Sequence, residues 1–255
     1  MNEISGLVIT LNESRNIVDC LRSMKQICDD IVVVDSGSSD DTVELAKAEG
    51  ATVIVQKPFL GDGPQRTHGL PYCRHQWILN LDADERLEDD FVQYVKRTNL
   101  DDLGVDLIQT RRRNLIGDRF TPHVGQYPDY VKRLFRKDRA SFIPVFAHTY
   151  VEAKSSISEP IHITHYSYRD YLDMVEKCKY AGWLAKNLAD SDKRLYSWQP
   201  FMHGFWSFLS HYVLKAGFLV GLDGLTLSIC KGVGSYLKYA HAIEIRRARK
   251  NKINE

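Results

Sequence analysis

The sequence contains few cysteines, no long apolar run and no excess of charge of either sign. Its five cysteines are scattered over 255 residues without a CxxC spacing, which gives no support for a disulfide framework or a zinc site and favours a reducing cytoplasm. The 34 Lys and Arg nearly balance the 33 Asp and Glu, and the net charge is +1. A broad basic surface is therefore not expected, and we predict no nucleic-acid partner.

Two further absences concern export and membranes. The N-terminus carries no basic segment, and its first apolar run ends at Asn12 and Glu13, so it predicts a strand and not a signal peptide. The stretch 217–237 is interrupted by Asp223 and Lys231, and falls short of the roughly 20 uninterrupted apolar residues of a spanning helix. We therefore predict no transmembrane segment, while a helix that lies on a membrane surface stays open.

The sequence also lacks two common phosphate-binding motifs. No GxGxxG follows the first predicted strand, and no GxxxxGK followed by Ser or Thr occurs anywhere. These absences argue against a dinucleotide site and a P-loop, because both depend on glycines that bring backbone N–H groups close to phosphate. A nucleotide site in this chain would have to be of another kind.

The first half of the sequence alternates β-branched runs with helical stretches. This alternation predicts an α/β fold with a mostly parallel sheet flanked by helices. The expected strands cover residues 7–10, 31–34, 52–55, 77–81, 105–111 and 130–135. The expected helices include 88–96 and 169–188, and one that follows Gly63-Pro64.

Polar residues follow three of the predicted strands at the point where each strand ends. Ligands of open α/β sheets bind beyond the carboxyl ends of the strands, so these segments are expected to build one polar site. The residues are Thr10, Asn12 and Glu13 after the first strand, Asp35 after the second, and Asp82-Ala83-Asp84 after the fourth.

The Asp82-Ala83-Asp84 triplet is the candidate for a metal site. In an extended segment Asp82 and Asp84 point to the same side, and Glu85 brings the number of carboxylates to three within four residues. A bound cation would relieve their mutual repulsion. Carboxylates without a nearby His or Cys suit Mg²⁺ or Mn²⁺.

Other interpretations of the same residues stay open. The acids could cap the helix expected near Glu88, and the segment after Asp35 could be a turn with a helix cap. An aspartyl-phosphate phosphatase would need a hydroxyl residue two positions after Asp84, where this chain has Arg86. The loop 61–66 could bring backbone and a guanidinium to phosphate, or could be a surface turn.

With these motifs in order, the chain resembles family 2 glycosyltransferases of GT-A fold. The resemblance rests on residues 7–13, 33–40, 65–66 and 81–85. Further segments resemble the bacterial branch that adds glucose to the inner core of lipopolysaccharide or lipooligosaccharide, namely 133–136, 165–168, 215–218 and 221–224. The resemblance implies a metal-dependent, inverting transfer of a hexose, glucose from UDP-glucose, to a heptose on a lipid-linked acceptor.

The resemblance also assigns roles to individual residues. Asp84 would hold the Mg²⁺ or Mn²⁺ that bridges the donor phosphates, and His165 would approach that metal or be a hydrogen-bonded structural residue. The substrate-binding set is Thr10, Leu11, Asn12, Glu13 and Asp35 around the nucleoside, Gln65 and Arg66 near the diphosphate, and Asp82 and Ala83 on the ribose side.

The general base departs from the family pattern. In related enzymes it is commonly the Glu of a His-Glu pair after the Arg-Leu-Phe segment, whereas the aligned pair here is His148-Thr149. Because threonine cannot act as that base, we expect Glu152 to replace it, with Asp129 as the second choice. The missing carboxylate keeps one alternative open, a non-catalytic sugar-nucleotide-binding or membrane-associated assembly protein.

The domain organisation follows from where the sequence pattern changes. We predict a catalytic domain over 1–195, with a nucleotide-sugar half over about 1–112 and an acceptor half over about 113–195, and a helical, aromatic-rich region over 196–255. The basic tail is expected to contact the cytoplasmic face of the inner membrane. For the aromatic side chains of this region we expect packing on the catalytic domain or a dimer contact; they include Phe201, Phe205 and Trp206, with Leu209 beside them.

Overall fold

The computed structural model describes residues 2–145 and 149–254. The chain forms two compact units, each built from two stretches of sequence. The first unit comprises Met1–Arg113 and Pro128–His165, and the second comprises Asn114–Tyr127 and Tyr166–Glu255. The domain boundaries expected from the sequence, near residues 112 and 195, stay predictions.

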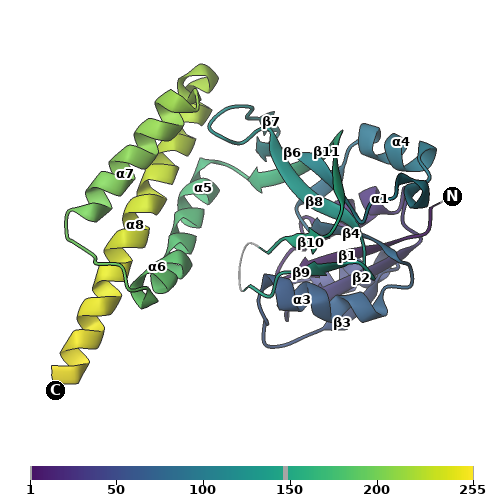
Figure 1. The fold of residues 1–255 in the computed structure, drawn as a ribbon, viewed down its shortest axis with the longest axis horizontal. Helices are drawn as coiled ribbons and strands as arrows, with labels where there is room; N and C mark the ends of the chain where they lie inside the picture. The colour runs from purple at the N-terminus through teal and green to yellow at the C-terminus, as the bar shows by residue number, and fades with distance from the viewer. Residues whose placement is uncertain (1, 146–148, 255) are drawn as a thin grey trace. The chain divides into compact units, whose positions relative to one another are not determined.

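Four parallel strands form one half of the sheet in the first unit, in the order β3-β2-β1-β4 (Figure 1). Three of the four are mostly apolar with almost every residue buried, which is the pattern of a sheet covered on both faces. The four expected strands are therefore confirmed. Their bounds are β1 Ile4–Thr10, β2 Asp30–Asp35, β3 Thr52–Val55 and β4 Trp77–Asp82.

The sheet continues beyond β4 in the order β8-β6-β11-β5, where β8 is antiparallel to β4 and to β6 and β5 is antiparallel to β11, and a small separate sheet pairs β9 with β10. The short strand β7 (Arg119–Phe120) pairs with β6. The expected strand at 105–111 overlaps β6, which begins two residues later at Leu107, and the expected strand at 130–135 lies within β8. The bounds are β5 Glu85–Leu87, β6 Leu107–Ile116, β8 Asp129–Arg136, β9 Ala140–Phe142, β10 Val151–Ala153 and β11 Ser156–Tyr168.

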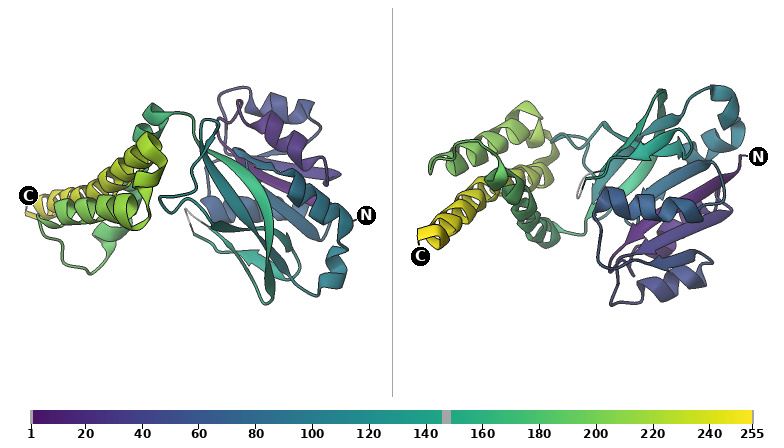
Figure 2. Two further views of the ribbon diagram at one scale, coloured as in Figure 1. Left: turned by 90° about the horizontal axis from the view of Figure 1, so that it is seen from above. Right: turned by 60° about the horizontal axis from the view of Figure 1, so that its bottom comes forward.

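Helices cover both faces of this sheet (Figure 2). On one face α1, α2 and α4 pack in a single apolar cluster with β1, β2 and β4, and α1 buries residues at helical spacing, Ile17, Cys20, Leu21 and Met24. On the other face Gly69 of α3 lies so close to the sheet that a Cβ there would be 2.6 Å from a methyl of Leu7. The bounds are α1 Ile17–Met24, α2 Thr42–Ala48, α3 Asp62–Gly69, η1 Leu70–Tyr72, α4 Asp89–Arg97 and η2 Leu100–Leu103.

One irregularity in the sheet bears on the site. The register between β6 and β8 runs from Ile108↔Leu134 directly to Gln109↔Lys132, so Arg133 is an extra residue on β8. A bulge of this kind bends the strand and turns a side chain away from the regular alternation. In the first unit it sets the direction of the Arg133 guanidinium, which is only 8% exposed.

The second unit is mainly helical, and α7 lies along α8 (Figures 1 and 2). Gly204 and Gly232 permit this approach, because a Cβ on Gly204 would lie 3.0 Å from the Cβ of Tyr236. The helix expected at 169–188 is divided by a short 3₁₀ turn. The bounds are α5 Tyr171–Lys177, η3 Cys178–Tyr180, α6 Ala181–Asp190, α7 Gln199–Leu209, η4 Ser210–Leu214, η5 Gly217–Val220 and α8 Gly221–Asn254.

Two expectations about this unit stay predictions. Phe201, Phe205 and Trp206 are 66%, 54% and 59% exposed, so they do not pack within the unit itself. The segment 217–250 is apolar enough to cross a membrane by length and composition alone, with a mean hydropathy of 1.2 over its best 18 residues. Asp223 and Lys231 interrupt the apolar run but leave its average apolar.

Candidate active site

The loops after β1 and β2 are joined by hydrogen bonds around Asp35, whose side chain is fully buried. One carboxylate oxygen of Asp35 accepts from Thr10 Oγ1 at 3.0 Å, and the other accepts from the backbone N–H groups of Gly37 and Ser38, both at 2.8 Å. The turn interpretation of this segment is thus correct as far as it goes. It also means that the carboxylate is fixed in position before any ligand binds.

Asn12 and Glu13 hold the rim of the same edge. Asn12 has a φ of 58°, a conformation that asparagine tolerates better than most residues, and its Oδ1 accepts from the backbone N–H of Ser39 at 2.8 Å. The backbone N–H of Glu13 donates to Thr42 Oγ1 at 2.8 Å. Leu11 between the two polar positions is 53% exposed. The structure therefore brings the expected nucleoside-binding residues together at one edge.

Gln65 and Arg66 of α3 point from the first turns of that helix towards the same edge. Gln65 is fully buried, with its Nε2 3.2 Å from Ser36 Oγ after β2. The Nε of Arg66 donates to Asn80 Oδ1 at 3.1 Å, and its Nη2 donates to the carboxylate of Asp82. The surface-turn alternative for this loop is thereby excluded for both side chains.

Arginines, and not a bare carboxylate cluster, surround the end of β4. Arg133 donates from Nη2 to Asp82 at 2.6 Å and to the fully buried Glu85 at 2.5 Å, and Arg112 donates to Glu85 at 3.1 Å. Burial alone would raise the pKa of Asp82, but Arg133, Arg66 and Arg112 outweigh it and hold that pKa well below its ordinary range. Asp82 is therefore ionised and already paired.

Two steps of the argument for a metal at the triplet were consequently wrong. Ala83 and Asp84 form the turn between β4 and β5, so the triplet is not an extended segment with its carboxylates on one side. The expected repulsion is relieved for Asp82 and Glu85 by arginine side chains, because α3, β6 and β8 deliver them to this point. Of the three acids, Asp84 is left as the one that faces a histidine.

Asp84 and His165 lie together as the resemblance implied. β5 pairs with β11 so that His165 stands opposite Glu85, one residue from Asp84. His165 Nε2 is 3.3 Å from Asp84 Oδ2, and both side chains are mostly buried. A carboxylate oxygen and an imidazole nitrogen at this spacing are suited to share a divalent cation.

A cavity of about 450 Å³ opens beside this cluster. Its walls carry strong charge of both signs together with hydrogen-bonding groups, and Asp62 is a carboxylate that the sequence analysis had not singled out. The lining residues are Asp62, Arg66, Asp82, Arg112, Tyr130, Val131, Lys132, Arg133, Thr149 and Tyr150. Such a cavity can accept a phosphorylated or hydroxyl-rich ligand next to Asp82.

The structure does not place either expected base on the wall of this cavity. Glu152 is an exposed residue of β10 with Oε1 3.4 Å from the hydroxyl of Tyr150, and Asp129 is bound by Arg112 Nε at 2.8 Å. His148 lies outside the described residues. Thr149 does line the cavity, with its hydroxyl donating to Ile143 O at 2.7 Å. The roles of Glu152 and Asp129 stay predictions.

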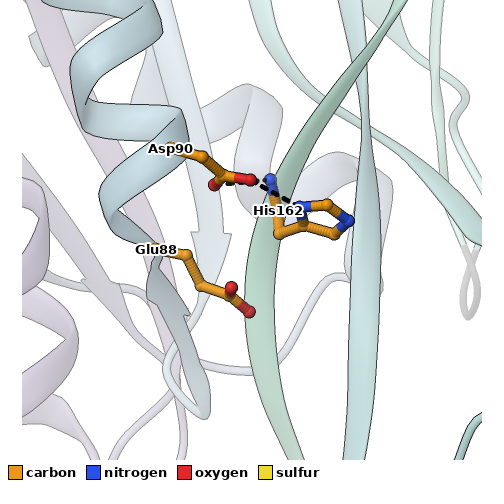
Figure 3. A group of neighbouring side chains, drawn as sticks. All are labelled: Glu88, Asp90 and His162. Carbon is orange, nitrogen blue, oxygen red and sulfur yellow. Dashed lines mark hydrogen bonds and ion pairs between the residues drawn. The ribbon is translucent and has the colours of Figure 1, made fainter.

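A second acidic group lies where α4 meets β11 (Figure 3). Ligand atoms of Glu88, Asp90 and His162 are all within 4.8 Å of one another, and Figure 3 shows the Asp90 carboxylate directed at His162 on β11, with the Glu88 side chain extending towards the same strand. Each carboxylate already has partners in the chain. Asp90 binds His162 Nδ1 at 2.5 Å, and Glu88 accepts from Thr164 Oγ1 at 2.8 Å and from Arg113. The group fastens α4 to β11.

The arginine partners of Asp82 and Glu85 are the residues that sequence reasoning missed. Arg133 belonged to the Arg-Leu-Phe segment that carried part of the resemblance, but no role was assigned to it. Arginine is rarely buried without a partner, so Arg133 and Arg112 within strands of the sheet were a usable signal. The carboxylates they bind could not be read from spacing, because Arg133 lies 51 residues after Asp82.

The similarities of this chain to known proteins agree with the geometry of the site. The model of the family described as glycosyl transferase family 2 matches residues 5–162. An uncharacterized glycosyltransferase of Rickettsia prowazekii is 31% identical and covers 99% of this chain and 91% of its own length. The lipopolysaccharide core biosynthesis glycosyltransferase LpsC of Rhizobium meliloti is 33% identical over 47% of this chain and 46% of its own length.

Solved structures give two further similarities. A crystal structure of TarS 1-349 from S. aureus has a TM-score of 0.49 and 13% identity, over 99% of this chain and 91% of that chain. Glucosyl-3-phosphoglycerate synthase from Mycobacterium tuberculosis, in complex with Mn²⁺, UDP and glucosyl-3-phosphoglycerate, has a TM-score of 0.36 and 26% identity, over 44% of each chain.

The sheet order and its polar edge define an α/β protein of GT-A fold. Since the family model covers more than half of the chain, the protein belongs to glycosyl transferase family 2, and it is a glycosyltransferase. The expected family and fold are thereby confirmed.

Proposed function

We propose that the protein transfers a hexose, glucose from UDP-glucose, onto a heptose of the lipopolysaccharide inner core, with inversion and with a divalent cation. The observation that carries the proposal is the pairing of Asp84 with His165 beside a cavity lined by Arg66 and Asp82. The similarity to LpsC over about half of the chain supports the core-biosynthesis setting. The donor sugar and the acceptor are taken from the resemblance of the sequence motifs.

Asp84 and His165 are the residues that would hold Mg²⁺ or Mn²⁺. One carboxylate and one imidazole leave the other positions of the ion for water and donor phosphates, as these cations prefer. When bound, the ion would neutralise the charge that builds on the departing diphosphate. Arg66 and Arg133 keep Asp82 ionised and fixed, so that its carboxylate can receive hydroxyl groups of the donor.

A carboxylate on the acceptor side has to remove the proton of the attacking hydroxyl. Asp82 is a poor base because its pKa is lowered by the arginines around it. Asp62 lines the same cavity, whereas Glu152 and Asp129 do not. We therefore add Asp62 to Glu152 and Asp129, and a comparison of Asp62→Asn, Asp129→Asn and Glu152→Gln selects among them. The base is the position whose change lowers kcat by roughly 10²–10⁴-fold while donor binding persists.

The acceptor is proposed to be lipid-linked, and the protein to work at the cytoplasmic face of the inner membrane. The basic C-terminal segment of α8 supports this in part. Arg247 and Lys250 are exposed, whereas Arg246 donates to the carbonyls of Ala189 and Lys193 and Arg249 pairs with Asp190. Fewer charges of the tail are therefore available to lipid headgroups than the sequence suggested.

The test is donor turnover with a matched pair of acidic variants. The purified protein is incubated with a panel of UDP- and GDP-sugars, Mn²⁺ or Mg²⁺, and deacylated core acceptors that end in heptose. We expect one UDP-hexose to be consumed and a product to form, and Asp84→Asn to remove it. Asp90→Asn changes the other acidic group and should leave turnover intact. Silence with every donor, or loss with Asp90→Asn alone, would overturn the proposal.

A second candidate function is donor binding without transfer. It is favoured by Thr149, which lines the cavity at the position where the resemblance implies the carboxylate of a His-Glu pair. This function requires calorimetric binding of a nucleotide sugar to the protein with no product on any acceptor. Formation of a glycosylated core that depends on one of the three carboxylates would eliminate it.

A further inference from the structure

The second unit presents exposed apolar side chains on α7, η4, η5 and the start of α8. Six of its side chains are each at least 54% exposed, namely Phe201, Phe205, Trp206, Leu214, Leu219 and Leu222. We call these six the apolar face. Phe201, Phe205 and Trp206 follow the helical spacing of one side of α7, and the rings of Phe201 and Phe205 stack with centroids 6.2 Å apart. Exposed apolar surfaces of this kind mark an interaction site.

Charge is almost absent from the same stretch of sequence. Between Gln199 and Cys230 the charged residues are Lys215 and Asp223. Asp223 is closed off by Arg119, whose Nε and Nη2 each donate to it at 2.9 Å, and by the hydroxyl of Tyr171 at 2.6 Å. The charge of Asp223, the one carboxylate between Gln199 and Cys230, is thus neutralised by a residue of the same unit.

The apolar face is not the side by which α7 and α8 hold each other. That side is formed by Gly204 and Gly232, where the Cβ of a substituted Gly232 would lie 3.1 Å from both Gly204 O and the Cβ of Phe208. Ser207 Oγ also donates to Lys231 O across the two helices at 3.2 Å. The two helices therefore satisfy their mutual contact and leave the apolar face for another partner.

The charges beyond Cys230 decide what that partner is. From Lys231 to Glu255 the chain carries seven Lys and Arg and two Glu, and Arg247 and Lys250 are exposed. Exposed Phe, Trp and Leu with cations on the same helix are typical of helices that lie in the interface of an anionic bilayer. A protein partner of matching chemistry would need a large apolar surface and an acidic one together.

The helix lengths favour a position on the membrane over one across it. The 11 residues of α7 span about 16 Å, and the 34 residues of α8 about 51 Å, at 1.5 Å per residue. The hydrocarbon core is about 30 Å thick. Because α7 is too short to cross and is packed along α8, the pair fits best with its axes in the plane of the interface.

We propose that the apolar face inserts into one leaflet of an anionic membrane, with α7 and the first half of α8 lying in the interface. Its purpose rests on the proposed function, because a lipid-linked acceptor brings the enzyme to the bilayer. The binding itself needs neither donor nor acceptor. Failure of membrane binding and failure of glycosyl transfer can therefore be told apart.

Vesicle flotation of the full-length protein tests the proposal. Vesicles of phosphatidylcholine with phosphatidylglycerol should carry the protein to the top of the gradient, and a Phe205→Glu, Trp206→Glu double variant should bind on the order of tenfold less or weaker still. The matched control is Tyr72→Glu, a change at a half-exposed aromatic residue of the first unit, which should bind like the unchanged chain. Equal binding of both variants, or no binding of the unchanged chain, would overturn the proposal.

Tryptophan quenching determines how the face is used. Lipids brominated on the acyl chain near the headgroup should quench Trp206 more than lipids brominated near the chain end, and Trp206→Phe should lose that difference. Stronger quenching near the chain end would show a deeper, spanning helix and contradict the interfacial position. A dimer in sedimentation without vesicles, abolished by the double variant, would assign the face to a second copy of the chain instead.

Discussion

Arg133 and Trp206 show how differently the two units treat their side chains. The guanidinium of Arg133 is 8% exposed and bound to two carboxylates, whereas the indole of Trp206, a far more apolar group, is 59% exposed. Each inverts the usual distribution of residues between interior and surface. In the first unit, carboxylates of the same chain compensate the burial of the arginine. In the second unit, a partner outside the chain would have to cover the exposed indole.

The comparison separates two kinds of functional signal. A buried charge that is paired with carboxylates fixes a site in advance, because reorganisation after ligand binding would leave ions unpaired in a poorly solvated place. An exposed apolar face needs no such fixing, and its free energy is gained only when a partner removes it from water. We therefore expect changes in the first unit to affect stability and chemistry together, and changes at the apolar face to affect binding alone.

The largest expected effect is the loss of Arg133. Arg133→Met would leave the buried Glu85 and the partly exposed Asp82 with fewer cations, and we expect the free energy of unfolding to fall by about 3–5 kcal/mol. Chemical denaturation measures the change, and donor binding should weaken with it. The control Arg139→Met removes a half-exposed arginine that pairs with Asp106 at 3.4 Å, and should cost about 1 kcal/mol or less. If both variants lost the same free energy of unfolding, the burial of the ion pairs of Arg133 would not contribute to stability.

The second prediction concerns the cation and sharpens the distinction between the two acidic groups. His165→Gln should weaken Mn²⁺ binding by at least the roughly 10–100-fold that the loss of a supporting residue costs at a metal site. His162→Gln, which belongs to the group in Figure 3, should leave Mn²⁺ binding unchanged. Mn²⁺ titration followed by electron paramagnetic resonance gives both affinities. The opposite ranking would move the metal to Glu88 and Asp90.

The parallel half of the sheet could be predicted because each of its strands can be recognised from its own short sequence. Continuous β-branched runs such as Ile31–Val34 are readable from a few neighbours, and the residues that follow them share one edge by topology. The strands outside this parallel half were harder to predict. β5 of the main sheet and β9 and β10 of the small separate sheet have three residues each, and such short segments become strands only through their partners.

The site was predictable to the same extent. The positions of Asp35, Asp84 and Arg66 at one edge followed from motifs, but the pairing of Asp82 with Arg133 did not. Their contact depends on a bulge in β8 and on strands that meet after a separation of 51 residues. The exposure of Phe205 was missed for a related reason. Composition indicates that aromatic side chains are stabilised by burial. It does not indicate whether they are buried by the same chain or by a binding partner.

The contact between α7 and α8 gives a prediction that sharpens the picture of the second unit. Gly204→Val would force a β-branched side chain into a contact that already measures 3.0 Å for a bare Cβ, and should lower the free energy of unfolding by about 1–3 kcal/mol. Gly234 on α8 has no atom within 4 Å of its Cβ position, so Gly234→Ala should raise stability by about 0.5–1 kcal/mol. Thermal unfolding of both variants measures whether stability falls in the first and rises in the second. If both variants were less stable than the unchanged chain, close packing would not be specific to Gly204.

The smallest expected effect lies at Asp40, which joins the loop after β1 to the start of α2. Its Oδ1 accepts from the backbone N–H of Thr42 and its Oδ2 from that of Ser14, both at 3.1 Å. Burial would raise its pKa, but hydrogen bonds from Thr42 and Ser14 lower it from the ordinary 3.8 to about 2. Since the folded-state value is the lower one, the stabilisation is complete above about pH 4 and is lost as the pH falls towards about 2.

Asp40→Asn should therefore cost about 1 kcal/mol or less at neutral pH and flatten the decline of stability between about pH 4 and 2. Asparagine keeps one accepting oxygen but cannot titrate, so the variant should approach the unchanged chain as acid is added. The control Asp41→Asn alters the exposed neighbour and should keep the decline. Denaturation midpoints of the three proteins are measured across this pH range. If stability declined in parallel in all three, Asp40 would not be the cause of the decline. The carboxylates around Arg133 would then be the source of the acid sensitivity.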